Sequence, residues 1–483
     1  MRIIKVSHYL GLLLVILGLF MLLPLIISLI LGESCSVAFA ISIGISVGTG
    51  LLLWRFVPAG EGGLSRREAI LLVVGGWVFA SLFGTLPYAL AGTFPSYIDA
   101  LFEAVSGFTT TGATMFASVE AQFRGIILWR SITQWLGGMG IITLFVALFP
   151  ILGIGAAHLV EAEMPGPQSD RLTPRIRDTA KAVWILYLGF SCLEFILLLI
   201  FGAPAFDALN ITLTTMPTGG FTPTDLSIGA YNSPPVEIIV LIFMAFAGVN
   251  FGLYYYLIWK RQVKPIISNP EFRMYVIILV VSSLLVAFDL IRNMGMSLEP
   301  ALRYGSLQVV SIMTTTGYAS ADFDVWPVFA KGVLLVLMII GASAGSTGGA
   351  LKVIRLLVLC KYAYRRILLA FNPRAVIHLK FGRNVLSETA ISGILGMAIV
   401  YFGIIIIGFL VMSAVGLDHV SALSSVLATL GNVGPGLGLV GPTSNYLSIH
   451  PLGKVFLTVC MLVGRLELFT VLMLVVPSFW KWR

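Results

Sequence analysis

Long apolar segments, separated by short polar connections, extend along the whole chain. A helix of about 20 apolar residues crosses the hydrocarbon core of a membrane, which is about 30 Å thick. Ten segments are long enough to do so: Tyr9–Leu31, Val37–Trp54, Ile70–Leu90, Ile126–Leu152, Ala182–Phe201, Val236–Trp259, Tyr275–Ile291, Gly332–Leu359, Thr389–Val415 and Gly453–Val476. We therefore predict an all-α integral membrane protein that crosses the membrane many times.

The composition excludes a water-soluble fold. Of the 483 residues, 58% are hydrophobic and only 11% are charged, which leaves too little polar surface for a soluble protein. If the ten segments cross in turn, all the clusters of lysine and arginine fall on one side and only isolated bases such as Arg124 and Arg303 lie on the other; such clusters favour the cytoplasm. We therefore expect both termini in the cytoplasm. The formal net charge of +8 indicates this topology and contact with anionic membrane lipids, without any need for nucleic acid.

Four segments rich in glycine and threonine lie on the predicted outer side. They read SGFTTTGATMF from Ser106, TTMPTGGFTPT from Thr214, SIMTTTGYASA from Ser311 and ATLGNVGPGLG from Ala428. One glycine in each is taken as equivalent: Gly112, Gly219, Gly317 and Gly434. These glycines are 107, 98 and 117 residues apart, and such a nearly regular period predicts an internally repeated architecture.

Each of these glycines follows a short, mostly apolar segment that begins near an acidic residue. The four acids are Asp99, Asp207, Glu299 and Asp418. The segments are too short to span the membrane, so we expect half-helices that enter it from the outer side. An acid is favourable at a helix N-terminus, which carries partial positive charge. The opposite ends carry partial negative charge, and four such ends together favour a cation.

The four loops that follow these half-helices favour a cation-conducting pore. Non-helical backbone is tolerated at membrane depth only where it is buried in protein or lines a water-filled cavity. Glycine adopts backbone angles closed to other residues, so each loop can aim carbonyl oxygens at a central axis, where they replace the hydration shell of an ion. The alternative is that small residues merely allow close helix packing. The recurrence in four loops favours the pore.

Motifs spread over almost the whole chain resemble those of a known family. They are FTTTGAT, WLGGMGII, AEMPGP, GGFT, NPEFRM, GASAGSTGGALKVIR, GPGLG and GRLELFT. The chain is similar to the TrkH/TrkG/KtrB superfamily of potassium transporters, and most of all to its TrkH branch. The resemblance implies two N-terminal transmembrane helices, residues 1–66, and four helix–pore loop–helix repeats around one pore, residues 67–165, 166–265, 266–370 and 371–483. It also implies a homodimer in which each protomer has its own pore.

The resemblance assigns a potassium selectivity filter to the four loops. Its residues in successive repeats are Thr110, Thr111, Gly112 and Ala113; Pro217, Thr218, Gly219 and Gly220; Thr315, Thr316, Gly317 and Tyr318; and Asn432, Val433, Gly434 and Pro435. None has the full TVGYG sequence of a strict potassium channel, and the fourth has Asn and Val in place of hydroxyl residues. We therefore expect moderate selectivity for K⁺ and Rb⁺ over Na⁺.

The segment GASAGSTGGALK, Gly341 to Lys352, interrupts an otherwise apolar span. Small residues predict that the helix breaks around a loop here; they include Gly341, Gly345, Ser346, Gly348 and Gly349. A phosphate-binding loop is excluded because the order G-x-x-x-x-G-K-[ST] is absent and no strand precedes the segment. A kink needed only for tight packing is the alternative. The resemblance implies an intramembrane gating loop under the filter.

Two ionisable residues lie deep in apolar segments. Arg465 costs at least about 2.5–3.5 kcal/mol there unless it faces a cavity or a partner, and Glu467 is a poor partner because residues two apart point to different faces of a helix. A structural pair with another carboxylate is one interpretation; the resemblance places Arg465 in the pore, as an electrostatic barrier below the filter. Glu194 is either a coupling site for protons or ions or, as we favour, a protonated or serine-bonded structural residue.

These patterns predict gated, channel-like uptake of K⁺ across the bacterial inner membrane. The alternative is a secondary transporter that couples K⁺ uptake to Na⁺ or H⁺. An enzyme has little support, because the histidines are dispersed and none lies beside a nucleophile motif. We expect no cofactor in this chain, whose longest polar connections, 161–181 and 361–383, are too short for a nucleotide-binding domain. The resemblance implies a separate cytosolic TrkA-type subunit that binds NAD(H), ATP or ADP.

Overall fold

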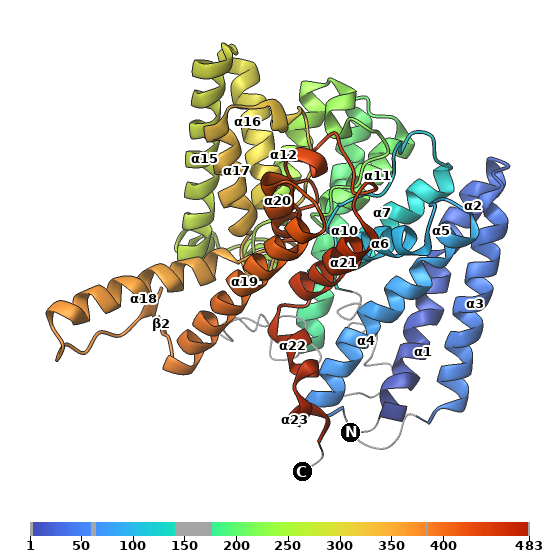
Figure 1. Cartoon of the computed structure of the whole chain (residues 1–483), viewed down its shortest axis with the longest axis horizontal. Helices are drawn as coiled ribbons and strands as arrows, with labels where there is room; N and C mark the ends of the chain where they lie inside the picture. Colours follow the sequence, from blue (N-terminus) through green and yellow to red (C-terminus); the bar gives the residue numbers. More distant parts are fainter. Residues whose placement is uncertain (1–2, 59–63, 141–175, 383, 482–483) are drawn as a thin grey trace.

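The computed structural model describes residues 3–58, 64–140, 176–382 and 384–481, which are mostly helical (Figure 1). At the N-terminal side, α1 (Ile3–Phe20), its continuation α2 (Leu22–Ile30) and α3 (Cys35–Phe56) form a hairpin of long helices. Gly11 and Gly50 let α1 and α3 approach closely, since a Cβ at either glycine would lie 2.7 Å from the main-chain oxygen of the other. Such contacts between small residues stabilise helix pairs in membranes.

The rest of the chain repeats one order of elements: a long helix, a short helix, a loop and a second long helix. The first two repeats contain α4 (Arg66–Gly84), α5 (Leu86–Leu90), α6 (Tyr97–Phe108) and α7 (Arg124–Gly138), then α10 (Ile176–Ile200), α11 (Ala205–Thr215), η2 (Ser227–Tyr231), α12 (Pro234–Ala247) and α13 (Phe251–Ile258). The last two contain α14 (Lys264–Ile267), α15 (Pro270–Met294), α16 (Leu298–Met313), η3 (Phe323–Val325), α17 (Val328–Ile339) and α18 (Val353–Phe371), then α19 (Glu388–Ala414), α20 (His419–Leu430), η4 (Gly438–Val440), α21 (Pro451–Arg465), α22 (Phe469–Val475) and α23 (Pro477–Trp480). The predicted all-α repeated fold is confirmed.

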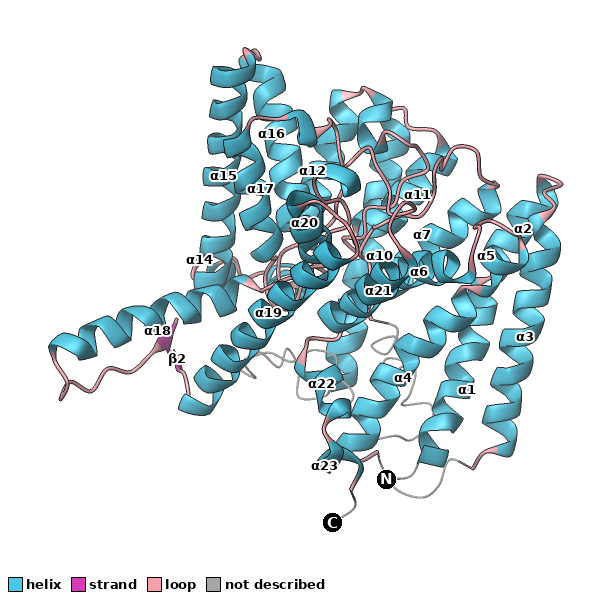
Figure 2. Ribbon diagram, viewed as in Figure 1, coloured by secondary structure: helices cyan, strands magenta, loops and turns pink. Residues whose placement is uncertain are grey.

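A short hairpin is the only sheet within the described residues. Strands β1 (Lys380–Phe381) and β2 (Asn384–Val385) are antiparallel, with Lys380 opposite Val385 and Phe381 opposite Asn384. Together with α18, the hairpin projects sideways from the helical body (Figure 2). This projection is the largest departure from the compact four-repeat arrangement.

Six helices in the described part of the chain are long and apolar enough to cross a membrane, and each of two bent helix pairs can count as one more span. The bent pairs correct the prediction of single helices over Val236–Trp259 and Gly453–Val476. The chain turns by 97° between α12 and α13 and by 118° between α21 and α22. At the first turn, the Asn250 side chain accepts a hydrogen bond from Gly252 N at 2.8 Å and so begins a new helix.

The other predicted break, in Gly332–Leu359, is confirmed, because residues 340–352 separate α17 from α18. The predicted span Ile126–Leu152 is described only in part: α7 ends at Gly138. The remainder of that span, the motif AEMPGP, the polar connection 161–175 and the boundary at residue 165 lie outside the described residues. The second long helix of each repeat therefore ends, turns or breaks before it completes the predicted span, a regularity that the apolar composition alone did not reveal.

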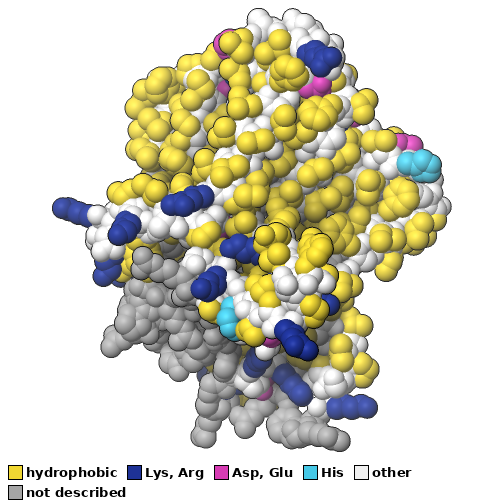
Figure 3. Space-filling view, turned by 90° about the vertical axis from the view of Figure 1, so that its left-hand side faces the viewer, with side chains coloured by type: hydrophobic (Ala, Val, Ile, Leu, Met, Phe, Trp, Pro, Cys, Tyr) yellow, Lys and Arg dark blue, Asp and Glu magenta, His cyan; other side chains and the backbone are white. Residues whose placement is uncertain are grey.

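Hydrophobic side chains cover most of the face seen in Figure 3, and lysines and arginines gather toward its lower end. The end of α3, the start of α4 and α23 lie at this same end of the molecule (Figure 1). The start of α4 is joined to α23 by Arg67, whose Nη1 donates hydrogen bonds to Phe479 O at 3.2 Å and Lys481 O at 3.0 Å. A belt of apolar surface with basic residues gathered at one end is typical of a multi-pass membrane protein.

Candidate functional site: a ring of four loops

Four short helices, α6, α11, α16 and α20, end at the centre of the molecule, and each is followed by a loop (Figure 2). We call them the pore helices. The predicted acids lie at their outer ends: three are in the first helical turn, and Asp418 is the N-cap of α20, accepting hydrogen bonds from Val420 N at 3.1 Å and Ser421 N at 3.2 Å. The helix termini are thus arranged as the sequence predicts, with negative ends inward.

The four loops that follow, here called the ring loops, share one backbone conformation. Each contains two residues with positive φ, separated by one residue: Thr110 (53°) and Gly112 (81°), Thr218 (56°) and Gly220 (78°), Thr315 (61°) and Gly317 (83°), Asn432 (54°) and Gly434 (101°). Threonine, which is β-branched, rarely adopts positive φ, although asparagine does so more readily, and residues held in strained conformations cluster at functional sites. Four repetitions of the strained pattern mark the ring loops as one site.

This pattern corrects the alignment of the second repeat by one residue. Gly220, and not Gly219, has the positive φ of Gly112, Gly317 and Gly434. Main-chain hydrogen bonds give the same register: the residue before each of these glycines donates to the oxygen five residues earlier, in Thr111→Ser106 (2.9 Å), Gly219→Thr214 (2.8 Å), Thr316→Ser311 (2.8 Å) and Val433→Ala428 (2.7 Å). The equivalent segments are therefore Thr110–Gly112, Thr218–Gly220, Thr315–Gly317 and Asn432–Gly434, and Pro217 lies before the second one.

The ring loops close around a common centre. A Cβ on each positive-φ glycine would lie within 3.0 Å of the main-chain oxygen of the middle residue in another loop: Gly112 of Gly219, Gly220 of Thr316, Gly317 of Val433, and Gly434 of Thr111. The contacts thus pass from repeat one to two, three, four and back to one. Real Cβ atoms do not approach so closely, so each glycine is required for the neighbouring carbonyl to take its place in the ring.

The loops outside the ring are also joined in a circle. Asp225 accepts from Val119 N at 2.5 Å and joins the outer loops of repeats one and two, and Gly229 N donates to Ala319 O at 3.1 Å between repeats two and three. Gly438 N donates to Asp324 Oδ1 at 3.0 Å, and Tyr446 N to Thr114 O at 2.9 Å, which completes the circle. A cavity of about 110 Å³ opens here against all four ring glycines.

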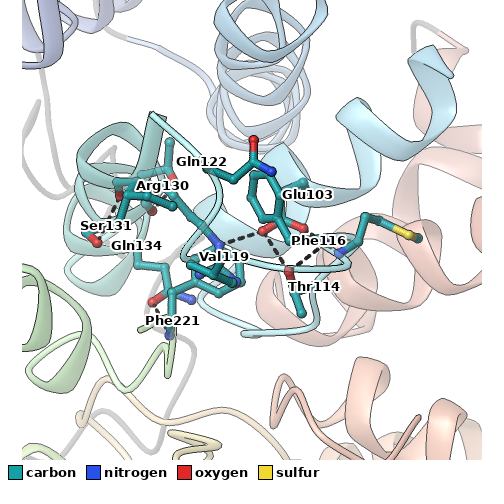
Figure 4. A network of polar contacts seen from close by, with 12 residues as sticks. Glu103, Thr114, Phe116, Val119, Gln122, Arg130, Ser131, Gln134 and Phe221 are labelled. Atoms are coloured by element: carbon teal, nitrogen blue, oxygen red, sulfur yellow. Dashed lines mark hydrogen bonds and ion pairs between the residues drawn. The ribbon is translucent and has the colours of Figure 1, made fainter. Parts of the chain in front are cut away.

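Buried ionic contacts behind the first ring loop were not found from the sequence. Glu103 of α6 accepts from Arg130 Nε at 2.6 Å and from Met115 N at 2.7 Å, and Arg130 Nη1 reaches Thr222 O of the second repeat at 3.0 Å (Figure 4). A second pair joins Lys454 of α21 to Asp99 at 2.5 Å. Arg130 and Lys454 are ionisable residues inside apolar segments, and this feature of the sequence could have indicated that each has a buried partner.

The segment 340–352, here called the inner loop, lies directly under the ring. Thr347 Oγ1 donates to Met216 O at 3.1 Å at the end of α11, and Gly349 N donates to Thr315 Oγ1 at 2.7 Å. Gly349 also packs against Gly431 O, at the end of α20. The inner loop therefore contacts the inner ends of three pore helices. Its glycines allow this close approach, because a Cβ on Gly341 or Gly349 would strike main-chain oxygen atoms.

Two polar anchors hold the inner loop from its sides. Glu271 of the NPEFRM motif accepts hydrogen bonds from Ala344 N at 2.7 Å and Ile354 N at 3.1 Å, so one carboxylate binds both the loop and the start of α18. At the turn between α12 and α13, Phe251 N donates to Gly345 O at 3.0 Å. Hydrogen bonds to neighbouring elements therefore hold the inner loop in place.

Arg465 is a third anchor. It donates to Thr347 O in the inner loop at 2.7 Å, and to Gly137 O at 2.6 Å and Gly138 O at 2.8 Å at the end of α7. Glu467 forms an ion pair with Arg355, in keeping with the unfavourable spacing of two residues between Glu467 and Arg465. A positive charge thus lies between the inner loop and the first repeat, below the ring.

Glu194 lies apart from the ring, fully buried on α10. Within the described residues, neither carboxyl oxygen of Glu194 has a hydrogen-bond partner; Thr215, at the end of the second pore helix, lies nearby. This placement is behind the pore helix and away from the central cavity. We therefore retain the interpretation of Glu194 as a structural residue.

These features define a class: a helical membrane protein in which four repeated half-helices and loops surround one central path. The model of the TrkH family, cation transport protein, matches residues 39–482, and the chain belongs to this family of transport proteins, which are not enzymes. Trk system potassium uptake protein TrkH of Salmonella typhimurium (strain LT2) is 38% identical over 482 residues, 99% of each chain. TrkG of Escherichia coli (strain K12) is 31% identical over 481 residues, 99% of this chain and 98% of that protein.

A solved structure supports the same assignment. The crystal structure of the potassium transporter TrkH from Vibrio parahaemolyticus superposes with a TM-score of 0.90, at 34% sequence identity, and the match covers 100% of both chains. The similarity therefore extends through all four repeats and both N-terminal helices. The fold and the family were correctly predicted from the motifs, and the protein is a multi-pass protein of the inner membrane.

Proposed function

We propose that this protein takes up potassium ions through the ring, by gated, channel-like conduction. The observation that carries the proposal is the closed circle of contacts between each ring glycine and the middle carbonyl of another loop. Carbonyl oxygens held in such a ring replace the hydration shell of K⁺, and four pore helices direct their negative ends inward. The full names of the relatives, which are potassium uptake proteins, support the choice of cation.

Moderate selectivity, with K⁺ and Rb⁺ preferred over Na⁺, follows from the unequal ring. The first and third loops carry hydroxyl pairs, Thr109 with Thr111 at 2.7 Å and Thr314 with Thr316 at 2.8 Å. The fourth has Asn432, whose Nδ2 donates to Thr111 Oγ1 at 2.9 Å. Because the loops are stabilised by different groups, the oxygen positions are not related by exact fourfold symmetry. Size discrimination is expected to be weaker than in a symmetric filter.

Uptake by cells tests the proposal. The protein, expressed with its regulatory subunit in a bacterium that lacks other potassium uptake systems, is expected to restore growth at low K⁺ and to accumulate Rb⁺. Growth without accumulation of either ion, in cells where the protein is present in the membrane, would contradict it.

Gating is proposed for the inner loop and Arg465. The loop closes the path under the ring, and the arginine adds positive charge next to it. A cation that leaves the ring inward meets both, so withdrawal of the loop is the step that opens the path. Both termini are proposed to face the cytoplasm, because the basic end of the molecule carries them.

Replacing Arg465 tests its electrostatic role. Arg465→Gln keeps hydrogen-bond donors for Thr347 O and the α7 carbonyls but removes the charge, and we expect K⁺ flux in liposomes to rise severalfold. A barrier of about 1 kcal/mol, which unit charges feel at 4 Å even in water, corresponds to about fivefold in rate. Arg465→Lys, which keeps the charge, is the matched control with flux near that of the original protein. Lower flux from correctly folded Arg465→Gln would support a purely structural role.

A homodimer and a TrkA-type regulatory ring complete the proposal. Exposed basic residues that can contact a cytosolic partner include Lys361 and Arg366 on α18. Nucleotide regulation must come from another polypeptide because the described cytoplasmic connections hold no nucleotide-binding domain.

Charge reversal on α18 tests the docking of that partner. Arg366→Glu is expected to reduce co-purification with a TrkA-type ring, and the loss is expected to be larger at higher salt, since salt screens the remaining contacts. Arg292→Glu, an exposed change at the opposite, outer end of α15, is the control and should leave co-purification unchanged. Failure of the unmodified protein to retain the ring at low salt would refute the partnership.

A further inference from the structure

Gln134, on α7 of the first repeat, forms part of the second ring loop. Its Nε2 donates to Gly219 O at 2.6 Å, and its Oε1 accepts from Phe221 N at 3.1 Å (Figure 4). The side chain is fully buried. One amide thus binds the main chain on both sides of Gly220, the positive-φ residue of that loop.

Gln134 also explains why this loop has two consecutive glycines. The middle residue of the ring is Thr111, Thr316 or Val433 in the other repeats, and each of these has a side chain. A Cβ on Gly219 would lie within 3.0 Å of the carboxamide of Gln134. The Gln134 amide therefore occupies the place that the missing side chain would take, and Gly219 leaves room for it.

The hydrogen bond changes the oxygen that Gly219 contributes to the ring. Gly219 O is the middle carbonyl that faces Gly112. A carbonyl has two lone pairs, so it can accept from Gln134 and still face a cation, but its direction is then held by the amide. Within the described residues, no donor contacts the main-chain oxygens of Thr111, Thr316 or Val433. Gly219 O is thus the one middle oxygen of the ring set by a side chain.

We propose that Gln134 determines ion specificity by positioning the Gly219 carbonyl, as a substitute side chain supplied by another repeat. This inference rests on the proposed function of the ring as a selectivity filter. Arg130, one turn earlier on α7, holds the same loop farther out through Thr222 O. The face of α7 that carries these two residues therefore makes the position of the second ring loop depend on the first repeat.

Permeability ratios test the proposal. Gln134→Leu has a similar volume but loses the donor and the acceptor, and it is expected to lower the K⁺/Na⁺ permeability ratio at least about threefold. Gln134→Glu can still accept from Phe221 N but, when ionised, cannot donate to Gly219 O, so it should also lower the ratio. Ser131→Ala is the control: Ser131 is buried on the same helix and donates to Asn210 Oδ1 at 2.6 Å, away from the ring. It is expected to affect stability but not the ratio.

A double substitution separates positioning from general packing. Gly219→Ala alone should collide with Gln134 and reduce uptake severalfold, whereas Gly219→Ala combined with Gln134→Ala places a side chain in the vacated space and should restore part of the uptake. Additive losses in the double variant, or unchanged ratios in both Gln134→Leu and Gln134→Glu, would overturn the inference. Gly317→Ser distinguishes failure of the Gln134 inference from failure of the filter proposal. If Gly317→Ser changes the permeability ratio and the Gln134 variants do not, only the role of Gln134 is wrong. If Gly317→Ser also leaves the ratio unchanged, the filter proposal is wrong.

Discussion

Gly220→Ser is expected to reduce the preference for K⁺ over Na⁺ by at least about tenfold, or about 1.4 kcal/mol of discrimination. The substitution places a Cβ against Thr316 O in the ring and puts a non-glycine residue at a φ of 78°. Either the loop shifts or the Thr316 carbonyl turns away, and both outcomes enlarge or distort the ring. Gly112→Ser, Gly317→Ser and Gly434→Ser should act in the same way, because each glycine faces a carbonyl of another loop.

Gly295→Ser is the matched control for this series. Gly295 also has positive φ, 66°, but nothing lies within 4 Å of a Cβ built there. Serine at that position incurs the same kind of backbone strain without touching the ring, so selectivity should not change. Rubidium and sodium uptake into liposomes measure the effect. Unchanged Na⁺ permeability in all four ring variants would show that the ring is not the filter.

Shortening the inner loop is expected to raise basal K⁺ flux by about tenfold or more while leaving ion preference intact. Deletion of Ser346–Gly348 removes the Thr347 contacts with Met216 O and Arg465. A shorter loop cannot reach under the ends of α11, α16 and α20, so the path below the ring stays open without the regulatory subunit. The ring itself keeps its own loop-to-loop contacts, which is why selectivity should persist.

Flux from correctly folded protein in liposomes, measured with and without the regulatory subunit, tests the gating proposal. Glu271→Gln is a milder companion: it weakens the acceptor for Ala344 N and Ile354 N and should raise basal flux less. A loop needed only for packing predicts the opposite result, namely misfolded or inactive protein. A folded deletion variant whose flux remains normal and dependent on the partner would contradict the gating role.

Local patterns were sufficient to predict much of the architecture. The acids at the starts of the pore helices, the period of the glycine-containing loops and the break in 340–352 depend on residues near one another in the chain. The same holds for Arg465 and Glu467, whose spacing of two made a pair unfavourable; Arg465 donates to Thr347 O, and Glu467 forms an ion pair with Arg355. These features follow from helix geometry and are independent of tertiary packing.

The register of the second loop could not be predicted in this way. In PTGGF, either glycine can adopt positive φ, and the observed register is the one in which the loop binds Gln134, which lies 85 positions away from Gly219 in the chain. The turns at Gly248–Asn250 and after Arg465 were missed because apolar residues continue on both sides, so length and hydropathy predict one span. Contacts with the inner loop, such as Phe251 N with Gly345 O, stabilise the turn, and sequence periodicity does not report such distant contacts.

The reversal potential of current through the purified protein, reconstituted with its regulatory subunit, tests the central claim most directly. With different K⁺ concentrations on the two sides of a planar bilayer, conduction through the ring predicts reversal close to the K⁺ equilibrium potential, moderated by a small Na⁺ permeability and unaffected by a proton gradient. A reversal potential that moves with an imposed Na⁺ or H⁺ gradient in the proportion of a fixed coupling ratio would contradict channel-like conduction and support a coupled carrier.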